Sequence, residues 1–119
     1  MNFIFDNERP IYIQLVEQLR VCIVSGYFVK GERLPSVREL ALMAKVNPNT
    51  MQKALVEVEE QKLIYTERTN GKFVTNDGVL IEKIRMSLAQ EKVENFFSDM
   101  KKIGMDESDT IKYLQEMIK

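Results

Sequence analysis

Residues Gly31–Thr75 read GERLPSVRELALMAKVNPNTMQKALVEVEEQKLIYTERTNGKFVT, and this stretch decides the fold. It contains two helix-start signals in quick succession, each followed by apolar residues at helical spacing. Two segments rich in β-forming residues, Leu63–Arg68 and Lys72–Thr75, come next. Thr69-Asn70-Gly71 separates them, and Asn-Gly is typical of tight hairpin turns. Two short helices followed by a hairpin are the elements of a winged helix-turn-helix, and the sequence predicts that fold.

The first helix start is a capping box, Ser36-Val37-Arg38-Glu39. In such a box the serine hydroxyl accepts a hydrogen bond from the third helical N–H, and the glutamate carboxylate accepts one from the serine N–H. A helix of little more than two turns is therefore predicted here. Its expected buried face consists of Val37, Leu40, Ala41 and Ala44.

The second helix start is Asn47-Pro48. Asparagine is a strong N-cap, and proline fits the first helical position because the N–H that it lacks would be unpaired there. We expect Val46 to pack on Met51 as a hydrophobic staple. The spacing i, i+3, i+4, i+7 predicts a buried face made of Met51, Ala54, Leu55 and Val58. The residues left exposed around the helix start are Asn49, Thr50, Gln52 and Lys53.

Upstream of this stretch, Pro10–Ser25 has the pattern of a further helix, with Pro10 at the first helical position. Gly26 follows its apolar stripe and suits a left-handed C-terminal cap. Cys22 falls on the stripe and is the chain's one cysteine, so no disulfide can form within the chain. We expect Cys22 to be a small buried hydrophobic residue and not a redox sensor.

Downstream, two further helices are predicted. A long helix runs over Val79–Ile103, Gly104 ends it, and Asp106 caps a shorter last helix. The fold class is thus mostly α with a small β-hairpin. We divide the chain into a winged helix-turn-helix domain over residues 1–77 and a helical tail over residues 78–119.

The composition excludes several kinds of chemistry. The 119 residues include no histidine, which excludes zinc sites of Cys and His and Ser-His-Asp triads. Acidic residues are scattered among basic ones, as on a solvated surface, and no phosphate-cradling loop or nucleophile–base pair is evident. We therefore expect no enzyme activity, no cofactor and no metal site.

The sequence also argues against insertion into a membrane and against secretion. No run of about 18 apolar residues occurs, as a spanning helix would need. The N-terminus, MNFIFDNERP, carries acidic residues where a secretion signal would be basic. We expect a cytoplasmic protein with no membrane partner.

The helix beginning near Asn47 has the properties of a DNA-recognition helix. The major groove admits an α-helix and presents a different donor and acceptor pattern for each base pair. Polar side chains at the N-terminal turns can reach that groove while the opposite face is anchored in the core. The hairpin, as the wing, brings positive charge to phosphates or to the minor groove. The candidate DNA-contacting residues are Ser36, Arg38, Asn47, Asn49, Thr50, Gln52, Lys53, Arg68, Gly71 and Lys72.

Several of these residues also have a purely structural interpretation. Asn47 can be only a helix cap, although its amide N–H groups would stay available. Gln52 and Lys53 can be plain solvated residues. Arg68 can pair with a neighbouring acid, and Gly71 serves the turn whether or not it meets DNA.

The net charge of −1 is low for a DNA-binding protein. Between Arg33 and Lys72, however, seven basic residues stand against five acidic ones. Three of those acids, Glu57, Glu59 and Glu60, cluster at the far end of one helix. The local arrangement of charge decides the field at a binding face, so DNA binding remains the favoured interpretation.

Spaced motifs then indicate a family. They are Pro10-Ile-Tyr-Ile-Gln-Leu15, Ile23-x-x-Gly26, Gly31-x-x-Leu-Pro-Ser-x-Arg-x-Leu-Ala41 and Gly71-Lys-Phe-Val74. Over about residues 8–76 the chain resembles the N-terminal domain of GntR-type bacterial transcriptional regulators. Val46–Thr50 followed by a short tail is similar to the YtrA-type subgroup in particular.

The resemblance implies that the residue matching Arg38, the start of the recognition helix and the wing glycine contact operator DNA. Many members of the family carry arginines where this chain has Pro48 and Gln52. That difference implies an operator sequence unlike theirs.

The tail of about 42 residues is too short for a ligand-binding domain. Two helices of this length cannot enclose the roughly 300–1,000 Å³ of a small-molecule site, so no effector pocket is expected and any effector is unknown. The apolar side of the tail needs a cover, which a second copy in a two-fold dimer provides. Packing on the chain's own winged domain is the alternative. The candidate dimerisation residues are Ile84, Leu88, Val93, Phe96, Phe97, Met100, Ile111, Leu114, Met117 and Ile118.

The favoured hypothesis is a sequence-specific, homodimeric transcriptional repressor whose partners are a second copy and a pseudo-palindromic double-stranded DNA operator. A dimer bound at a promoter would block RNA polymerase, and repression is therefore the default. The alternative is an adaptor, in which the winged fold docks a protein partner without specific DNA binding.

Overall fold

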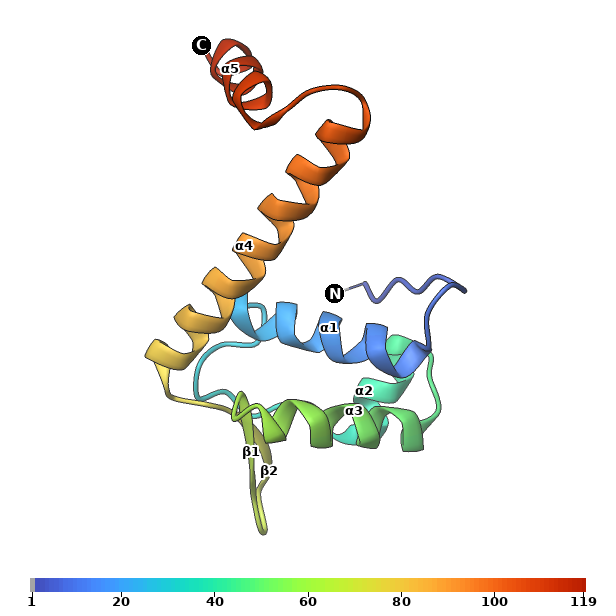
Figure 1. The fold of residues 1–119 in the computed structure, drawn as a ribbon. Helices are drawn as coiled ribbons and strands as arrows, with labels where there is room; N and C mark the ends of the chain where they lie inside the picture. The colour runs from blue at the N-terminus through green and yellow to red at the C-terminus, as the bar shows by residue number, and fades with distance from the viewer. Residues whose placement is uncertain (1) are drawn as a thin grey trace. The chain divides into compact units, whose positions relative to one another are not determined.

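The structure is a computed structural model that describes residues 2–119 (Figure 1). In chain order its elements are α1 (Ile11–Val24), α2 (Val37–Ala44), α3 (Pro48–Glu60), β1 (Ile64–Glu67), β2 (Gly71–Val74), α4 (Gly78–Lys102) and α5 (Glu107–Met117). The chain divides into two compact units inside α4, the first ending at Lys83 and the second beginning at Ile84. The predicted fold class, mostly α with one hairpin and a winged helix-turn-helix order, is confirmed.

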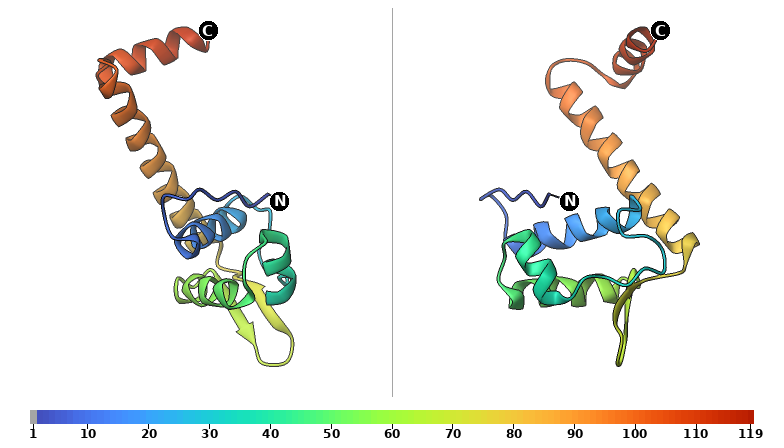
Figure 2. Two further views of the ribbon diagram at one scale, coloured as in Figure 1. Left: turned by 90° about the vertical axis from the view of Figure 1, so that its right-hand side faces the viewer. Right: turned by 180° about the vertical axis from the view of Figure 1, so that it is seen from behind.

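The core of the first unit lies between α1, α2 and α3, and the hairpin projects beyond them (Figure 2). Each helix contributes a stripe of apolar side chains to this core. Leu15 of α1, Leu40 of α2 and Met51 of α3 are each 0% exposed. Burying one side chain of this size contributes roughly 1.5–3 kcal/mol. The predicted buried faces of α2 and α3 are confirmed, except that Val37 is half-buried.

Helix α1 begins and ends within one residue of the prediction. Pro10 is its N-cap, with an extended ψ of 139°, and not its first helical residue. The fixed φ of proline suits both positions, so the sequence could not distinguish them. Gly26 has a φ of +84°, which confirms the left-handed cap. Cys22 is buried as expected, and burial raises the pKa of its thiol to about 12.

Strands β1 and β2 form the wing, an antiparallel pair that joins Ile64 to Val74 at its base and Glu67 to Gly71 at its tip. Ile64 and Val74 are buried and anchor the wing to the core. The connection consists of residues 68–70 and not of Thr69–Gly71 as predicted. Gly71 has a φ of +97°, a conformation that glycine adopts easily. It is the first residue of β2 and already pairs with Glu67.

The second unit contains the remainder of α4 and α5. Gly104, with a φ of +90°, follows α4, and Asp106 caps α5 by accepting a hydrogen bond from the Asp109 N–H at 2.8 Å. Both predictions are confirmed. Thr110 is 0% exposed, and its hydroxyl donates to the Asp106 carbonyl at 2.9 Å. All ten predicted dimerisation residues are at least partly exposed.

Within residues 2–119, no helix is both long enough and apolar enough to cross a membrane.

Candidate nucleic-acid interface

The start of α2 is fixed by the predicted capping box. The Ser36 hydroxyl accepts from the Glu39 N–H at 3.1 Å, and the Glu39 carboxylate accepts from the Ser36 N–H at 3.0 Å. Donation from the Ser36 backbone, and then from its side chain, lowers the pKa of Glu39. Glu39 therefore stays ionised and bound at its own helix end. Arg38 is exposed in the first turn, and no hydrogen bond or ion pair within the described residues holds its guanidinium.

A tight turn joins α2 to α3 and sets their relative orientation. Lys45 adopts a left-handed conformation with a φ of +57°, and the Val46 N–H donates to the Ala41 carbonyl at 3.0 Å. Asn47 then caps α3, because its Oδ1 accepts from the Asn49 N–H at 2.7 Å. The capping role of Asn47 is confirmed, and its Nδ2 takes no part in that bond. The N-terminal N–H groups of α3 are thus presented at an exposed helix end.

The first turns of α3 carry an exposed polar edge. Asn49, Gln52 and Lys53 are exposed as predicted. Thr50 was expected to be exposed as well, but it is half-buried, since it lies on the flank of the helix beside the fully buried Met51. Asn49 and Gln52 therefore offer the least hindered amide groups on this edge.

Lys53 also has a structural contact that its position in the sequence did not reveal. Its Nζ lies 4.5 Å from the centroid of the Tyr12 ring on α1. A cation above an aromatic face is stabilised by roughly 0.5–1 kcal/mol at exposed sites. This contact holds the ammonium at one side of α3, so Lys53 is not simply a solvated residue.

Lys72 of the wing is likewise engaged within the protein. Its Nζ lies 3.2 Å from Glu59 Oε1 on α3 and donates to the Thr66 hydroxyl at 2.9 Å. Burial opposes ionisation of Glu59, but donation from Thr66 and Lys72 outweighs it, so the pKa of Glu59 is lowered. Lys72 thus ties the wing to α3, and contact between Lys72 and DNA stays a prediction.

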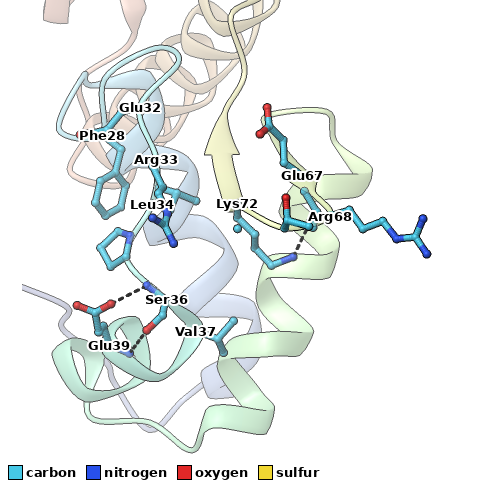
Figure 3. A pocket seen from close by; sticks show the side chains of 14 residues that line it. Phe28, Glu32, Arg33, Leu34, Ser36, Val37, Glu39, Glu67, Arg68 and Lys72 are labelled. Carbon is cyan, nitrogen blue, oxygen red and sulfur yellow. Dashed lines mark hydrogen bonds between the residues drawn. The ribbon is translucent and has the colours of Figure 1, made fainter.

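The side chain of Arg68 lies in different surroundings from that of Lys72. It stands exposed at the tip of the wing, and its guanidinium points away from the wing and from the other labelled side chains (Figure 3). Glu67 instead accepts from the Asn70 side chain at 3.0 Å. Within residues 2–119 no acid pairs with Arg68, which removes the ion-pair interpretation of this residue.

A groove of about 760 Å³ separates the wing from the start of α2 (Figure 3). Ser36 borders it on one side, and Arg68, Gly71 and Lys72 border it on the other. The structure thus brings together these four of the predicted DNA-contacting residues. Arg38 and the predicted residues of α3 are not among those that line the groove.

Arg33 also borders this groove, and it is not among the DNA-contacting residues predicted from the sequence. The backbone of Arg33 pairs with that of Phe73 on β2 in a single antiparallel bridge. The neighbouring Leu34 N–H donates to the Lys72 carbonyl at 2.8 Å, and the Val74 N–H donates to the Glu32 carbonyl at 2.9 Å. The segment before α2 therefore lies along β2 and is hydrogen-bonded to it, without forming a strand of its own. A basic residue between Gly31 and Leu34 was the signal available in the sequence.

The comparisons with known proteins decide the family. The model of the bacterial regulatory proteins of the gntR family matches residues 11–74, which include α1, α2, α3 and the wing. The chain belongs to the GntR family. The resemblance inferred from the spaced motifs is confirmed.

Relatives of this GntR-family protein extend the similarity to the tail. The uncharacterized HTH-type transcriptional regulator YhcF of Bacillus subtilis is 33% identical over 90% of this chain and 88% of its own length. The HTH-type transcriptional repressor YtrA of the same organism is 32% identical over 95% of this chain and 85% of its own. The similarity to YtrA agrees with the expected short subgroup.

Solved structures give the same result. A GntR family transcriptional regulator from Listeria monocytogenes is 41% identical, covers 94% of this chain and 98% of its own, and superposes with a TM-score of 0.84. The DNA-binding domain of AraR, solved in complex with operator ORE1, is 26% identical over 63% of this chain and 94% of its own, with a TM-score of 0.54.

Membership of the GntR family identifies this chain as a transcriptional regulator and not an enzyme. Within residues 2–119, no group of three or more His, Cys, Asp or Glu residues is arranged to hold a metal ion.

Proposed function

We propose that this GntR-family protein is a homodimeric repressor that binds a pseudo-palindromic DNA operator. The observation that carries the proposal is the uncovered start of α3. Asn49 and Gln52 are exposed there, on a helix whose opposite face is buried through Met51. A helix with this division fits the major groove, where side chains near the N-terminus meet base edges.

The side chains at this face suit different parts of a duplex. Asparagine and glutamine amides bond well to adenine, through its N6 and N7. Arg38 is exposed, has no partner among residues 2–119, and can take a guanine or a phosphate. Arg68 at the wing tip and Lys53 on α3 bring positive charge to the backbone, which fixes the protein's position without reading sequence.

The second unit supports the homodimer. Phe96 is 40% exposed, Leu114 is 36% exposed and Ile118 is 80% exposed in the single chain. Exposed apolar side chains gathered on a short tail mark an interaction surface. A second copy offers a matching surface by two-fold symmetry, and the two α3 helices of the dimer would read half-sites about one helical turn apart.

Repression follows from a dimer that occupies promoter DNA, and the relative YtrA is named a repressor. DNA binding would place this activity in the cytoplasm. No dedicated effector pocket is part of the proposal.

Selection of bound sequences from random double-stranded DNA tests the proposal. We expect enrichment of two inverted half-sites with a fixed spacing of about 10–10.5 base pairs between their centres. A gel shift with the selected duplex and with a scrambled duplex of the same composition then measures specificity. The proposal fails if no sequence is enriched, or if the protein binds the selected and the scrambled duplex equally. Either result would favour the adaptor hypothesis.

A further inference from the structure

We propose that Arg33 is a further DNA-contacting residue, which binds a backbone phosphate at the groove between the wing and α2. The inference rests on the proposed DNA-binding function and adds a contact to it. Arg33 would then contribute to DNA affinity in a way that does not depend on the DNA sequence.

The backbone fixes the position of Arg33 along the wing. Arg33 is held beside β2 by its backbone bridge to Phe73. Backbone hydrogen bonds of the flanking Leu34 and Glu32, at 2.8 and 2.9 Å, support this position. The guanidinium therefore starts from a defined backbone position at the groove. Ordering an arginine on a fixed segment reduces the entropy that is lost when it binds a ligand.

The guanidinium of Arg33 lies beside Gly71 of the wing. A Cβ added at Gly71 would lie 3.4 Å from Arg33 Nε and 3.6 Å from Arg33 Nη2. The first distance is at the near edge of ordinary contact, so Arg33 lies directly against the wing glycine. The φ of +97° at Gly71 serves the turn, and this turn places the start of β2 next to Arg33.

Each acidic residue of the groove accepts a hydrogen bond from a local donor. Glu32 accepts from the Val29 N–H at 3.1 Å, Glu39 from the Ser36 N–H at 3.0 Å, and Glu67 from the Asn70 side chain at 3.0 Å. None of them forms an ion pair with Arg33 within the described residues, although the charge of Arg33 contributes to the lowered pKa of Glu39.

Among the basic residues that line the groove, Lys72 is held by Glu59, whereas Arg33 and Arg68 form no hydrogen bond or ion pair within residues 2–119. A guanidinium offers a planar fork of N–H donors that matches two oxygens of one phosphate. DNA lying across α3 and the wing would bring a strand past this groove, because Arg68 and Gly71 line the same groove from the wing side. The ligand is therefore a phosphate of the duplex.

The test compares R33Q and R33K with the wild-type protein on the selected operator and on a random-sequence duplex of equal length. Binding is measured by fluorescence anisotropy at several salt concentrations. K112Q, which changes an exposed lysine of α5, is the control for the loss of one positive charge. Circular dichroism melting establishes that each variant is folded.

We expect R33Q to weaken binding to both duplexes by the same factor, roughly fivefold to tenfold, and to reduce the slope of log K against log salt by about 0.9. R33K should keep the slope because it keeps the charge, and K112Q should match the wild type. A folded R33Q with the wild-type slope would overturn the inference, as would a loss confined to the operator. If the wild-type protein itself binds neither duplex, the proposed function fails.

Discussion

Lys72 Nζ lies 3.2 Å from Glu59 Oε1, and this pair joins the second strand of the wing to the last turns of α3. The Thr66 hydroxyl donates to the same carboxylate oxygen at 2.8 Å, so one glutamate holds both strands. This contact ties the wing to the proposed recognition helix, in addition to the burial of Ile64 and Val74. From the sequence, Lys72 is predicted to contact DNA. In the structure, its ammonium pairs with Glu59 of the same chain.

Glu59→Gln should lower the free energy of unfolding at neutral pH by about 1 kcal/mol or less, because the pair is partly exposed. The pKa of Glu59 is lowered in the folded state from its ordinary value of 4.5. Its contribution to stability is therefore fully present above pH 4.5 and is lost as the pH falls through the lowered pKa. Urea unfolding of both proteins across this range checks the prediction. A difference that grows on acidification would contradict it.

Arg38→Ala should weaken binding to the selected operator by about 1–3 kcal/mol, since the guanidinium is exposed on α2 and has no partner in the described part of the chain. Gel shifts with the operator and with its scrambled form measure the change. A larger loss on the operator indicates a base contact, and an equal loss indicates a phosphate contact. Wild-type binding to both duplexes would exclude Arg38 from the interface.

Lys53→Ala should reduce the salt slope of DNA binding by about one, as expected for the loss of one phosphate contact. The variant also loses the contact between Lys53 and the Tyr12 ring, so Tyr12→Leu serves as the matched control. Tyr12→Leu keeps the charge and should keep the slope. Equal slopes for Lys53→Ala and the wild type would assign Lys53 to the Tyr12 contact alone.

Phe96→Glu should convert the proposed dimer into monomers by placing a charge among the exposed apolar residues of the second unit. Sedimentation equilibrium should give twice the chain mass of 13.9 kDa for the wild type and close to the chain mass for the variant. Ser98→Glu adds the same charge at an exposed polar position two residues away and should remain dimeric. A monomeric wild-type protein would contradict the dimer.

Cys22 should react slowly with thiol reagents in the folded protein. Burial raises the pKa of its thiol from 9.0 to about 12, so almost no thiolate is present at pH 8, and the side chain is 2% exposed. Labelling followed by mass spectrometry should accelerate strongly in denaturant. Rapid labelling of the folded protein would show that the core around α1 opens.

Local signals in the sequence predicted the fold well. The caps at Ser36, Asn47 and Asp106 are made by residues two or three positions apart, and all three form as predicted. The spacing of apolar residues likewise identified the buried faces of α2 and α3. The GntR family resemblance followed from motifs that combine these same local features.

The contacts that adjust the candidate site were not predictable in this way. Lys72 and Glu59 are 13 positions apart, Lys53 meets a tyrosine from α1, and Arg33 lies against Gly71. Each of these contacts depends on how separate elements pack, which no local pattern encodes. Because of this, the sequence treated Lys72 and Lys53 as available cations and did not select Arg33.

We infer that the start of α3 and the wing tip form the face that meets DNA. The most direct test is to record amide chemical shifts of the protein by NMR while the selected operator is added. We expect the largest changes at the residues of the first turns of α3, from Asn47 to Lys53, and at Arg68 and Gly71. Unchanged signals at these positions, together with large changes confined to the tail, would contradict the claim.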